Sequence, residues 1–285
     1  MTSEIKTIVS KVFNTSKDNV KIIERLLGGK SHYTYLFSLD NKKYTIRLIG
    51  EGGNLFVDRK IEYENIKKIE SLNLNNKSIY FDVNTGLKIA EYQEGTVLSD
   101  LNAYKYLKEI ATAFKTLHNS KIKPVNNYDL IKRLKLYESY NMTTDSNYLN
   151  LRNEWILLYE KYYFNRNLVF CHNDLQKNNM VIDKNNKIYL LDWEYAGLND
   201  YFYDIASFGK YNIELLEVYL QRKPEKEEIR DVWFYKMFQN LQWYQVALYK
   251  DSIGLSIKLK VDFHELANYF ISEANKHYLL IKDGY

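Results

Sequence analysis

The segment Cys171-His172-Asn173-Asp174-Leu175-Gln176-Lys177-Asn178-Asn179 decides the fold of this 285-residue chain. Asp192-Trp193-Glu194 follows thirteen residues after Asn179. Between them, the apolar stretches 180–183 and 187–191 flank the polar turn Lys184-Asn185-Asn186, a pattern that predicts two strands joined by a tight turn. Because a hairpin brings its two ends together, we expect Asp192 to lie near Asn179.

The order of polar side chains in this segment is typical of phosphoryl transfer. That reaction needs a positioned acceptor hydroxyl and cations against the phosphate charge, and little covalent help. Asp174 is predicted to be the catalytic base, with His172 bracing the catalytic loop. Asn179 and Asp192 would supply the oxygen ligands that Mg²⁺ prefers. A single His or Asp near a strand is usually a structural hydrogen bonder, but the joint pattern favours a small-molecule kinase that uses ATP and Mg²⁺.

Composition agrees with an enzyme of this size. The chain is 46% hydrophobic, and its 40 Lys and Arg residues nearly balance 36 Asp and Glu residues, leaving a formal charge of +4. No broad nucleic-acid surface is therefore expected. The single cysteine, Cys171, excludes an internal disulfide and fits a reducing compartment. Without a signal core or a membrane-length apolar run, we expect a cytoplasmic protein with no membrane insertion.

Residues 1–92 are predicted to form an N-terminal nucleotide-binding lobe. Apolar residues at helical spacing open it, and strands are expected over 20–27, 33–39 and 43–49. Gly28 and Gly29, with Ser31, would form a glycine-poor loop over the phosphates. Paired glycines are also common in plain turns, so this motif is weak alone.

Arg47 is a cation in a strand otherwise fit for burial, and a charge there is costly unless paired. Kinases place a cation on this strand to contact the phosphates and hold it with a glutamate of the next helix, here about 58–72. Glu62 or Glu64 could be that partner; a solvent-facing Arg47 is the structural alternative.

A second hairpin, 78–82 and 87–92, leads to a hinge at 93–96. Backbone groups of Glu91 and Tyr92 are expected to pair with adenine.

Residues 93–285 are predicted to form a helical C-terminal lobe with the catalytic loop and the substrate pocket. Helices are expected over about 107–117, 129–140, 147–163, 225–251 and 263–281, with Pro224 just inside the start of the long one. The fold class is therefore α+β and bilobal: a β-rich N-terminal lobe and a mainly helical C-terminal lobe.

The quoted segment, together with 192–200 and Asp204-Ile205-Ala206, resembles the choline/ethanolamine kinase family, especially its bacterial choline kinase branch. That family belongs to the aminoglycoside phosphotransferase-like superfamily, which has a protein-kinase-like fold. The resemblance implies Asp174 as base, with Asn179 and Asp192 on magnesium. Two positions depart from it: His32 stands where relatives usually have Asn, and Arg47 stands where many phosphotransferases have Lys.

The resemblance also implies that Gln176, Glu194 and Tyr195 lie near an amino-alcohol, and that Trp243 walls its pocket. Physical chemistry agrees in part, because a trimethylammonium cannot donate hydrogen bonds and binds aromatic faces. The chain has 27 Tyr and 4 Trp, and the segment 233–244 is especially aromatic. Core packing is the alternative for each of these rings.

Three hypotheses follow. The first is a choline kinase that makes phosphocholine from choline and MgATP. The second is another small-alcohol kinase on the same scaffold, for ethanolamine, thiamine or an aminoglycoside; acids in the pocket would favour it, because primary amines need hydrogen-bond acceptors. The third is a non-catalytic kinase-like binding or spore-coat protein, against which the intact base and metal positions argue. The partner is a small-molecule substrate, and the protein is expected to be a monomer or homodimer.

Overall fold

The computed structural model describes residues 2–26, 32–141 and 145–284. Packing divides the chain into two compact units. The first comprises residues 1–109 and 177–196, and the second comprises 110–176 and 197–285. Residues 93–109 and the segment 177–196 therefore pack with the N-terminal sheet. The assignment of nucleotide binding to residues 1–92 and of substrate binding to 93–285 remains a prediction.

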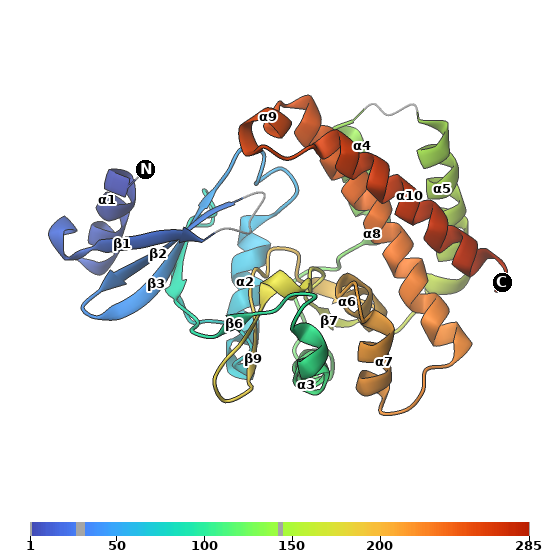
Figure 1. Ribbon diagram of the computed structural model, residues 1–285, viewed down its shortest axis with the longest axis horizontal. Helices are drawn as coiled ribbons and strands as arrows, with labels where there is room; N and C mark the ends of the chain where they lie inside the picture. The colour runs from blue at the N-terminus through green and yellow to red at the C-terminus, as the bar shows by residue number, and fades with distance from the viewer. Residues whose placement is uncertain (1, 27–31, 142–144, 285) are drawn as a thin grey trace. The chain divides into compact units, whose positions relative to one another are not determined.

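A five-stranded antiparallel sheet forms the centre of the first unit (Figure 1). Its spatial order is β1-β2-β3-β5-β4, with bounds β1 Lys21–Leu26, β2 His32–Leu39, β3 Lys42–Ile49, β4 Ser78–Phe81 and β5 Lys88–Glu91. Helix α1 (Thr2–Phe13) packs its apolar residues on this sheet, because Ile5 and Val9 join Phe37, Ile46 and Ile89 in one buried cluster. Burial of this apolar surface is the main stabilising contribution to the sheet.

Helix α2 (Arg59–Ile69) begins where Asp58 accepts hydrogen bonds from the backbone N–H groups of Lys60 and Ile61. A three-stranded sheet completes the first unit, in the order β6 (Thr96–Val97), β8 (Met180–Ile182) and β9 (Ile188–Leu190). The segment 180–190 forms the hairpin that the sequence predicts, but it packs with the first unit and not with the helical lobe to which it was assigned from the sequence.

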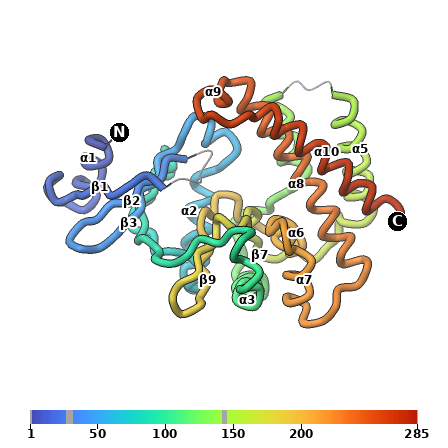
Figure 2. Tube along the Cα trace, viewed as in Figure 1, coloured from blue at the N-terminus to red at the C-terminus, as the bar shows by residue number. Residues whose placement is uncertain are grey.

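The second unit is mainly helical. Its elements are most of α3 (Leu107–His118), α4 (Leu130–Ser139), α5 (Ser146–Leu158) with a π-helical turn at Tyr159–Tyr163, β7 (Val169–Cys171), β10 (Gly197–Asn199), α6 (Tyr201–Ser207), α7 (Asn212–Leu220), α8 (Lys226–Ser252), α9 (Leu255–Leu259) and α10 (Phe263–Lys282). Helices α8 and α10 run side by side, orange and red in Figure 2. Helix α8 is buried on nearly every side, which explains its aromatic and apolar composition.

The α+β class is confirmed, and most elements begin and end within a few residues of their expected bounds. Two expectations are wrong in detail. Pro224 lies before the long helix, because Glu225 is its N-cap and forms a capping box with Glu228. The helix expected over 147–163 leaves α geometry after Leu158. The phosphate-loop residues Gly28, Gly29 and Ser31 lie outside the described residues.

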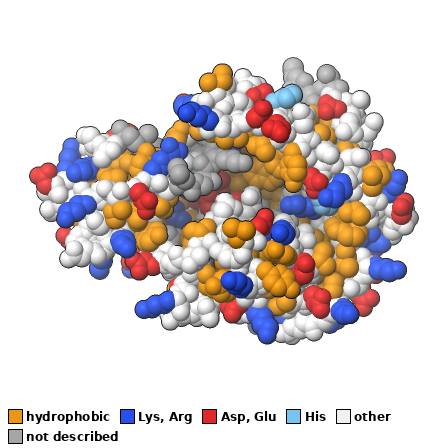
Figure 3. Space-filling view, viewed as in Figure 1, with side chains coloured by type: hydrophobic (Ala, Val, Ile, Leu, Met, Phe, Trp, Pro, Cys, Tyr) orange, Lys and Arg blue, Asp and Glu red, His pale blue; other side chains and the backbone are white. Residues whose placement is uncertain are grey.

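Acidic and basic side chains are interspersed on the face shown in Figure 3, with no large area of one sign. This distribution matches the small net charge of +4. Among the described helices, none combines the length and the apolar composition that a membrane span requires.

Candidate active site

The catalytic-loop segment belongs to the helical unit, where Asp204 of α6 fixes its backbone. The Asp204 carboxylate is fully buried and accepts hydrogen bonds from the N–H groups of His172, at 2.9 Å, and Asn173, at 2.8 Å. His118 Nε2 lies 3.0 Å from the same carboxylate. Asn173 has a φ of 64°, a left-handed conformation that Asn tolerates better than most residues. These contacts hold the turn that presents Asp174.

Asp174 is half-buried, as the proposed base must be to meet a substrate. Gln176 Nε2 donates a hydrogen bond of 2.7 Å to Asp174 Oδ1. His172 is fully buried, and its Nδ1 accepts from the Asp174 N–H at 3.3 Å. His172 therefore has the geometry of a loop brace. Gln176, predicted to touch the substrate, orients the carboxylate of Asp174 in this conformation.

The two predicted metal ligands lie together in the first unit, at the open end of the β8–β9 hairpin. The Leu191 N–H donates to the Asn179 carbonyl at 2.8 Å, so Asp192 follows directly after the residue that pairs with Asn179. The Asp192 side chain is 29% exposed, and its φ of 64° turns the chain sharply at that point. Both residues are partly exposed, and amide and carboxylate oxygens are donors that suit Mg²⁺. The residues present therefore fit the predicted ion.

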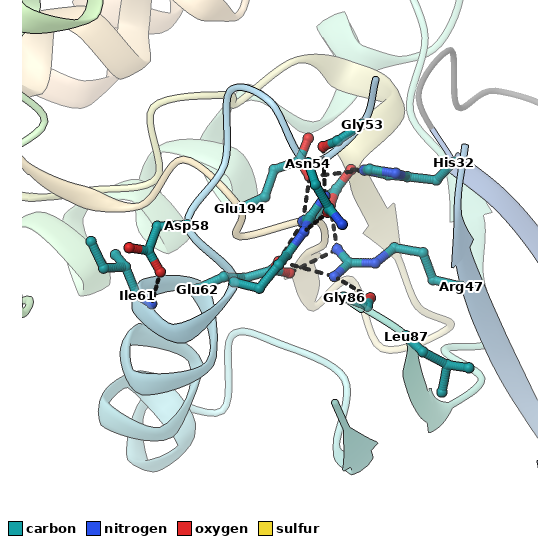
Figure 4. Close-up of polar contacts among 12 residues, drawn as sticks. His32, Arg47, Gly53, Asn54, Asp58, Ile61, Glu62, Gly86, Leu87 and Glu194 are labelled. Atoms are coloured by element: carbon teal, nitrogen blue, oxygen red, sulfur yellow. Dashed lines mark hydrogen bonds and ion pairs between the residues drawn. The ribbon is translucent and has the colours of Figure 1, made fainter. Parts of the chain in front are cut away.

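Arg47 forms a buried ion pair with Glu62, which settles the choice between Glu62 and Glu64 that the sequence left open. Arg47 Nη1 and Nη2 donate to Glu62 Oε1 and Oε2 at 2.7 and 2.9 Å, a bidentate arrangement (Figure 4). Nη1 also donates to Asp192 Oδ1 at 3.1 Å. Burial alone would lower the pKa of Arg47, but Glu62, Asp192 and Glu194 outweigh it, so the guanidinium stays charged.

Arg59, at the start of α2, extends this pair into a network. Its Nη1 donates to Glu62 Oε2 at 2.6 Å and to Glu194 Oε2 at 2.8 Å. His32 Nε2 lies 2.8 Å from the same Glu194 oxygen (Figure 4). Burial would raise the pKa of Glu194, but His32, Arg59 and Arg47 lower it to about 2. Glu194, predicted to face the ammonium group of the substrate, is thus buried and shared between two cationic partners.

The predicted adenine contacts are partly occupied within the sheet. The Glu91 N–H donates to the Lys77 carbonyl at 2.9 Å, and the Tyr92 N–H donates to the Lys43 carbonyl at 3.0 Å. The Glu91 carbonyl accepts from Asn76. In this conformation neither N–H is open to a nucleotide, so an adenine donor contact at these two residues is not available. Carbonyl contacts at these positions remain a prediction.

Most aromatic residues of 233–244 belong to the core. Tyr235 is 1% exposed and donates to Asp200, and Gln239 donates to the Tyr203 carbonyl. Trp243 is only half-buried on α8, in the helical unit. Tyr195 is buried in the first unit. The sequence-based roles of Trp243 and Tyr195 in a substrate pocket remain predictions.

Two groups of potential metal ligands occur among the described side chains, each with ligand atoms within 4.8 Å. In the first group, Asp204 already accepts hydrogen bonds from the catalytic loop and from His118, and Cys171 donates to the Asn199 carbonyl. His32, Asp192 and Glu194 belong to the ion network, where Arg47 and Arg59 already neutralise the carboxylates. Because each carboxylate of this cluster already accepts a hydrogen bond from a guanidinium group, Asp192 from Arg47 and Glu194 from Arg59, hydrogen bonding rather than a resident transition metal accounts for the cluster.

Sequence reasoning missed Arg59 and the role of His32. Arg59 had one local signal, because it stands three residues before Glu62 on a helix and so shares its face. His32 was noticed only as a departure from the family pattern. Its partner Glu194 is 162 residues away, a pairing that no local pattern indicates.

Comparisons with known proteins agree with this geometry. The family model described as choline/ethanolamine kinase matches residues 23–223. Protein LicA of Haemophilus influenzae is 24% identical over 249 residues, covering 80% of this chain and 73% of the relative. Probable choline kinase 1 of Arabidopsis thaliana is 30% identical over 229 residues, covering 72% of this chain and 65% of the relative.

Among solved structures, the chain is similar to the crystal structure of choline kinase LicA from Streptococcus pneumoniae. The TM-score is 0.80 at 24% sequence identity, and the match covers 96% of this chain and 97% of the other. The protein-kinase-like fold predicted from the sequence is thereby confirmed.

Proposed function

Because the chain belongs to the choline/ethanolamine kinase family, it is an ATP-dependent phosphotransferase with an alcohol acceptor, and we propose that the acceptor is choline. The products are then phosphocholine and ADP. A relative named as a probable choline kinase supports this assignment. So does the engagement of Glu194 by Arg59 and His32, because a primary amine such as ethanolamine needs free hydrogen-bond acceptors, whereas a trimethylammonium does not.

The observation that carries the proposal is Asp174, oriented by Gln176 on a loop that Asp204 holds. In the proposed reaction the choline oxygen attacks the γ-phosphorus, and the bond from that phosphorus to the bridging oxygen of ADP breaks. The hydroxyl proton passes to an oxygen of Asp174. Gln176 donates a hydrogen bond to Oδ1 of Asp174, which keeps the carboxylate in one orientation while its other oxygen takes the proton.

Asn179 and Asp192 are the residues that would hold Mg²⁺, and the ion supplies positive charge against the phosphates when bound. Asp192 already accepts from Arg47, so its carboxylate is oriented before any ion arrives. Arg47, anchored by Glu62, ties the position of α2 to that carboxylate. Tyr195 and Trp243 are proposed to offer aromatic faces to the trimethylammonium group, each worth about 0.5–2 kcal/mol.

The test is ATP turnover by the purified protein, with choline, ethanolamine, thiamine and an aminoglycoside offered at matched concentrations. We expect ADP release that depends on choline and far less on the other three. Selectivity for ethanolamine would keep the mechanism and reject choline as acceptor. Absence of turnover with all four would reject the proposal for these substrates.

The matched variant for this assay is Asp174→Asn, which keeps the shape of the side chain and its contact with Gln176 but removes the base. We expect turnover to fall by about 10²–10⁴-fold, the usual contribution of general base catalysis. Asp183→Asn, in the β8–β9 turn, is the control and should retain wild-type turnover. Near-normal turnover in Asp174→Asn would exclude Asp174 as the base.

A further inference from the structure

Lys88 on β5 is a buried lysine that the proposed mechanism does not use. It is 8% exposed. In the antiparallel ladder its Cα pairs with that of Arg47 on β3 and with that of Phe81 on β4. Residues paired in this way project from the same face of a sheet, so Lys88 and Arg47 lie on one face. The Arg47 guanidinium lies over the Phe81 ring on that face, 5.6 Å from its centroid.

The ammonium group of Lys88 has no partner among the residues that the structure describes. Within residues 2–26, 32–141 and 145–284, no carboxylate lies within 4.0 Å of this ammonium group, and no hydrogen bond from it is present. Burial, followed by the nearby Arg47 charge, lowers the pKa of Lys88 to about 8, while Glu62 and Asp192 act in the opposite direction. A buried, unpaired cation opposite another cation is unfavourable in the free protein. An anion would relieve it.

Arg47, by contrast, has no terminal donor to spare. A guanidinium has five N–H groups, four of them on the two terminal nitrogens. In Arg47 those nitrogens make four hydrogen bonds: one to Asp192, and, as Figure 4 shows, two to Glu62 and one to the Gly86 carbonyl. Arg47 is therefore an anchor for α2 and for Asp192 in this conformation. Lys88, which pairs with Arg47 in the ladder, is the neighbouring cation, and its ammonium donors make no hydrogen bond to the residues that the structure describes.

We propose that Lys88 binds the phosphate chain of the nucleotide, doing on β5 the work that a lysine on the arginine-bearing strand does in other kinases. This inference rests on the proposed use of ATP. The ligand chemistry is a nucleoside di- or triphosphate: the anion must reach a cation beside Asp192, the proposed metal ligand, and only a polyphosphate brings several negative oxygens there. Adenosine has none.

The first experiment compares Lys88→Met with wild type by calorimetric titration of ATP, ADP and adenosine, without choline. Methionine keeps the length and apolar stem of the side chain. We expect Lys88→Met to weaken ATP and ADP binding by about 10- to 100-fold, the range for a charge-assisted hydrogen bond, and to leave adenosine binding unchanged. Lys67→Met, an exposed lysine of α2 paired with Glu70, is the control and should bind all three as wild type does.

Thermal unfolding of the free variants separates binding from a structural role. If Lys88 serves the phosphates, removing its unpaired charge leaves the Tm of the free protein unchanged or raises it. If it stabilises the sheet instead, Lys88→Met lowers the Tm and weakens adenosine and ATP binding equally, which would overturn the inference. Lys88→Arg restores the charge and should recover most of the ATP affinity.

A second experiment uses only the wild-type protein and so does not depend on how a variant folds. An acyl phosphate of ATP is added, and modified peptides are mapped by mass spectrometry. The neutral Lys88 amine attacks the acyl carbon, an amide bond forms, and the acyl–oxygen bond breaks to release ATP, while the amine proton goes to solvent. We expect acylation at Lys88 that excess ATP prevents. Acylation confined to other lysines would overturn the inference.

The outcomes also separate this inference from the proposed function. If wild type binds neither ATP nor ADP, the proposed use of ATP fails and Lys88 has no phosphate ligand. If wild type and Lys88→Met bind ATP with equal affinity, only the role of Lys88 fails.

Discussion

Arg59 donates hydrogen bonds to both Glu62 and Glu194, so a change at this residue tests the ion network. Arg59→Met removes one partner from each of two buried carboxylates, although Arg47 and His32 remain. We expect the free energy of unfolding to fall by about 3 kcal/mol, near the lower end for breaking a buried ion pair. Urea unfolding measures it.

The control is Lys60→Met, the exposed neighbour of Arg59 on α2, for which we expect no measurable change. If the Arg59→Met and Lys60→Met variants are equally stable, the ion pairs of Arg59 contribute no more to stability than a methionine side chain at the same position. Buried ion pairs sometimes behave in that way, so the comparison has a real alternative.

At the scale of single residues, the sequence predicted those partners that are close in the chain. Glu62 was one of two candidates for Arg47, because both lie on the next helix. Glu194 was assigned to the substrate because its buried partners, Arg59 and His32, are 135 and 162 residues away. The sequence shows that Glu194 lies two residues after a proposed metal ligand, but it does not show that Arg59 and His32 already bind its carboxylate.

The packing of α10 against α8 contains a buried histidine, His277, whose pKa is lowered. His277 of α10 is buried, and its Nδ1 donates to the Glu273 carbonyl. Burial lowers the pKa of His277, the Glu273 carbonyl raises it, and Lys236 of α8 and Lys276 lower it. The net shift is downward from 6.5.

The folded protein therefore holds His277 neutral where the unfolded chain would bind a proton. The unfolded state takes up more protons as the pH falls below 6.5, so stability is lost as the pH falls through the folded-state pKa of His277. Urea unfolding between about pH 5 and pH 8 should show this loss in wild type and a shallower one in His277→Gln. His264→Gln, an exposed histidine of the same helix, should follow wild type. A parallel profile for His277→Gln would remove His277 as the cause.

Local patterns predicted the elements well where the signal is local. The β8–β9 hairpin was predicted from two apolar stretches and a polar turn, and the structure confirms it. The sequence pattern placed Pro224 just inside the start of α8, because proline is frequent in the first turn of helices. In the structure Glu225 is the N-cap, and the side chains of Glu225 and Glu228 accept hydrogen bonds from the first backbone N–H groups. Aromatic helix α8 was ambiguous in sequence, since a core and a ligand cage have the same composition.

At the scale of the whole molecule, the rate at which the Cys171 thiol is alkylated measures how often the helical unit unfolds enough to expose it. It is the only cysteine, it is fully buried, and burial followed by the charges of Asp204 and Asp200 raises the pKa of its thiol. We expect iodoacetamide to modify native protein much more slowly than urea-unfolded protein at the same pH. Modification should accelerate with denaturant in step with loss of tertiary structure. Native protein that reacts as fast as the unfolded chain would contradict the packing of β7.

The division of the chain into two units also bears on how the protein is made. Three cations of the first unit, His32, Arg47 and Arg59, are paired with Asp192 and Glu194, which are synthesised after residues 110–176 of the helical unit and before residues 197–285. Until residues 192–194 are synthesised, Arg47 and Arg59 can pair with Glu62 of the same unit, but not with Asp192 or Glu194. A gene fragment that stops at residue 109 would encode a sheet without those carboxylates. The first unit is thus completed by a segment that is translated between the two parts of the second unit.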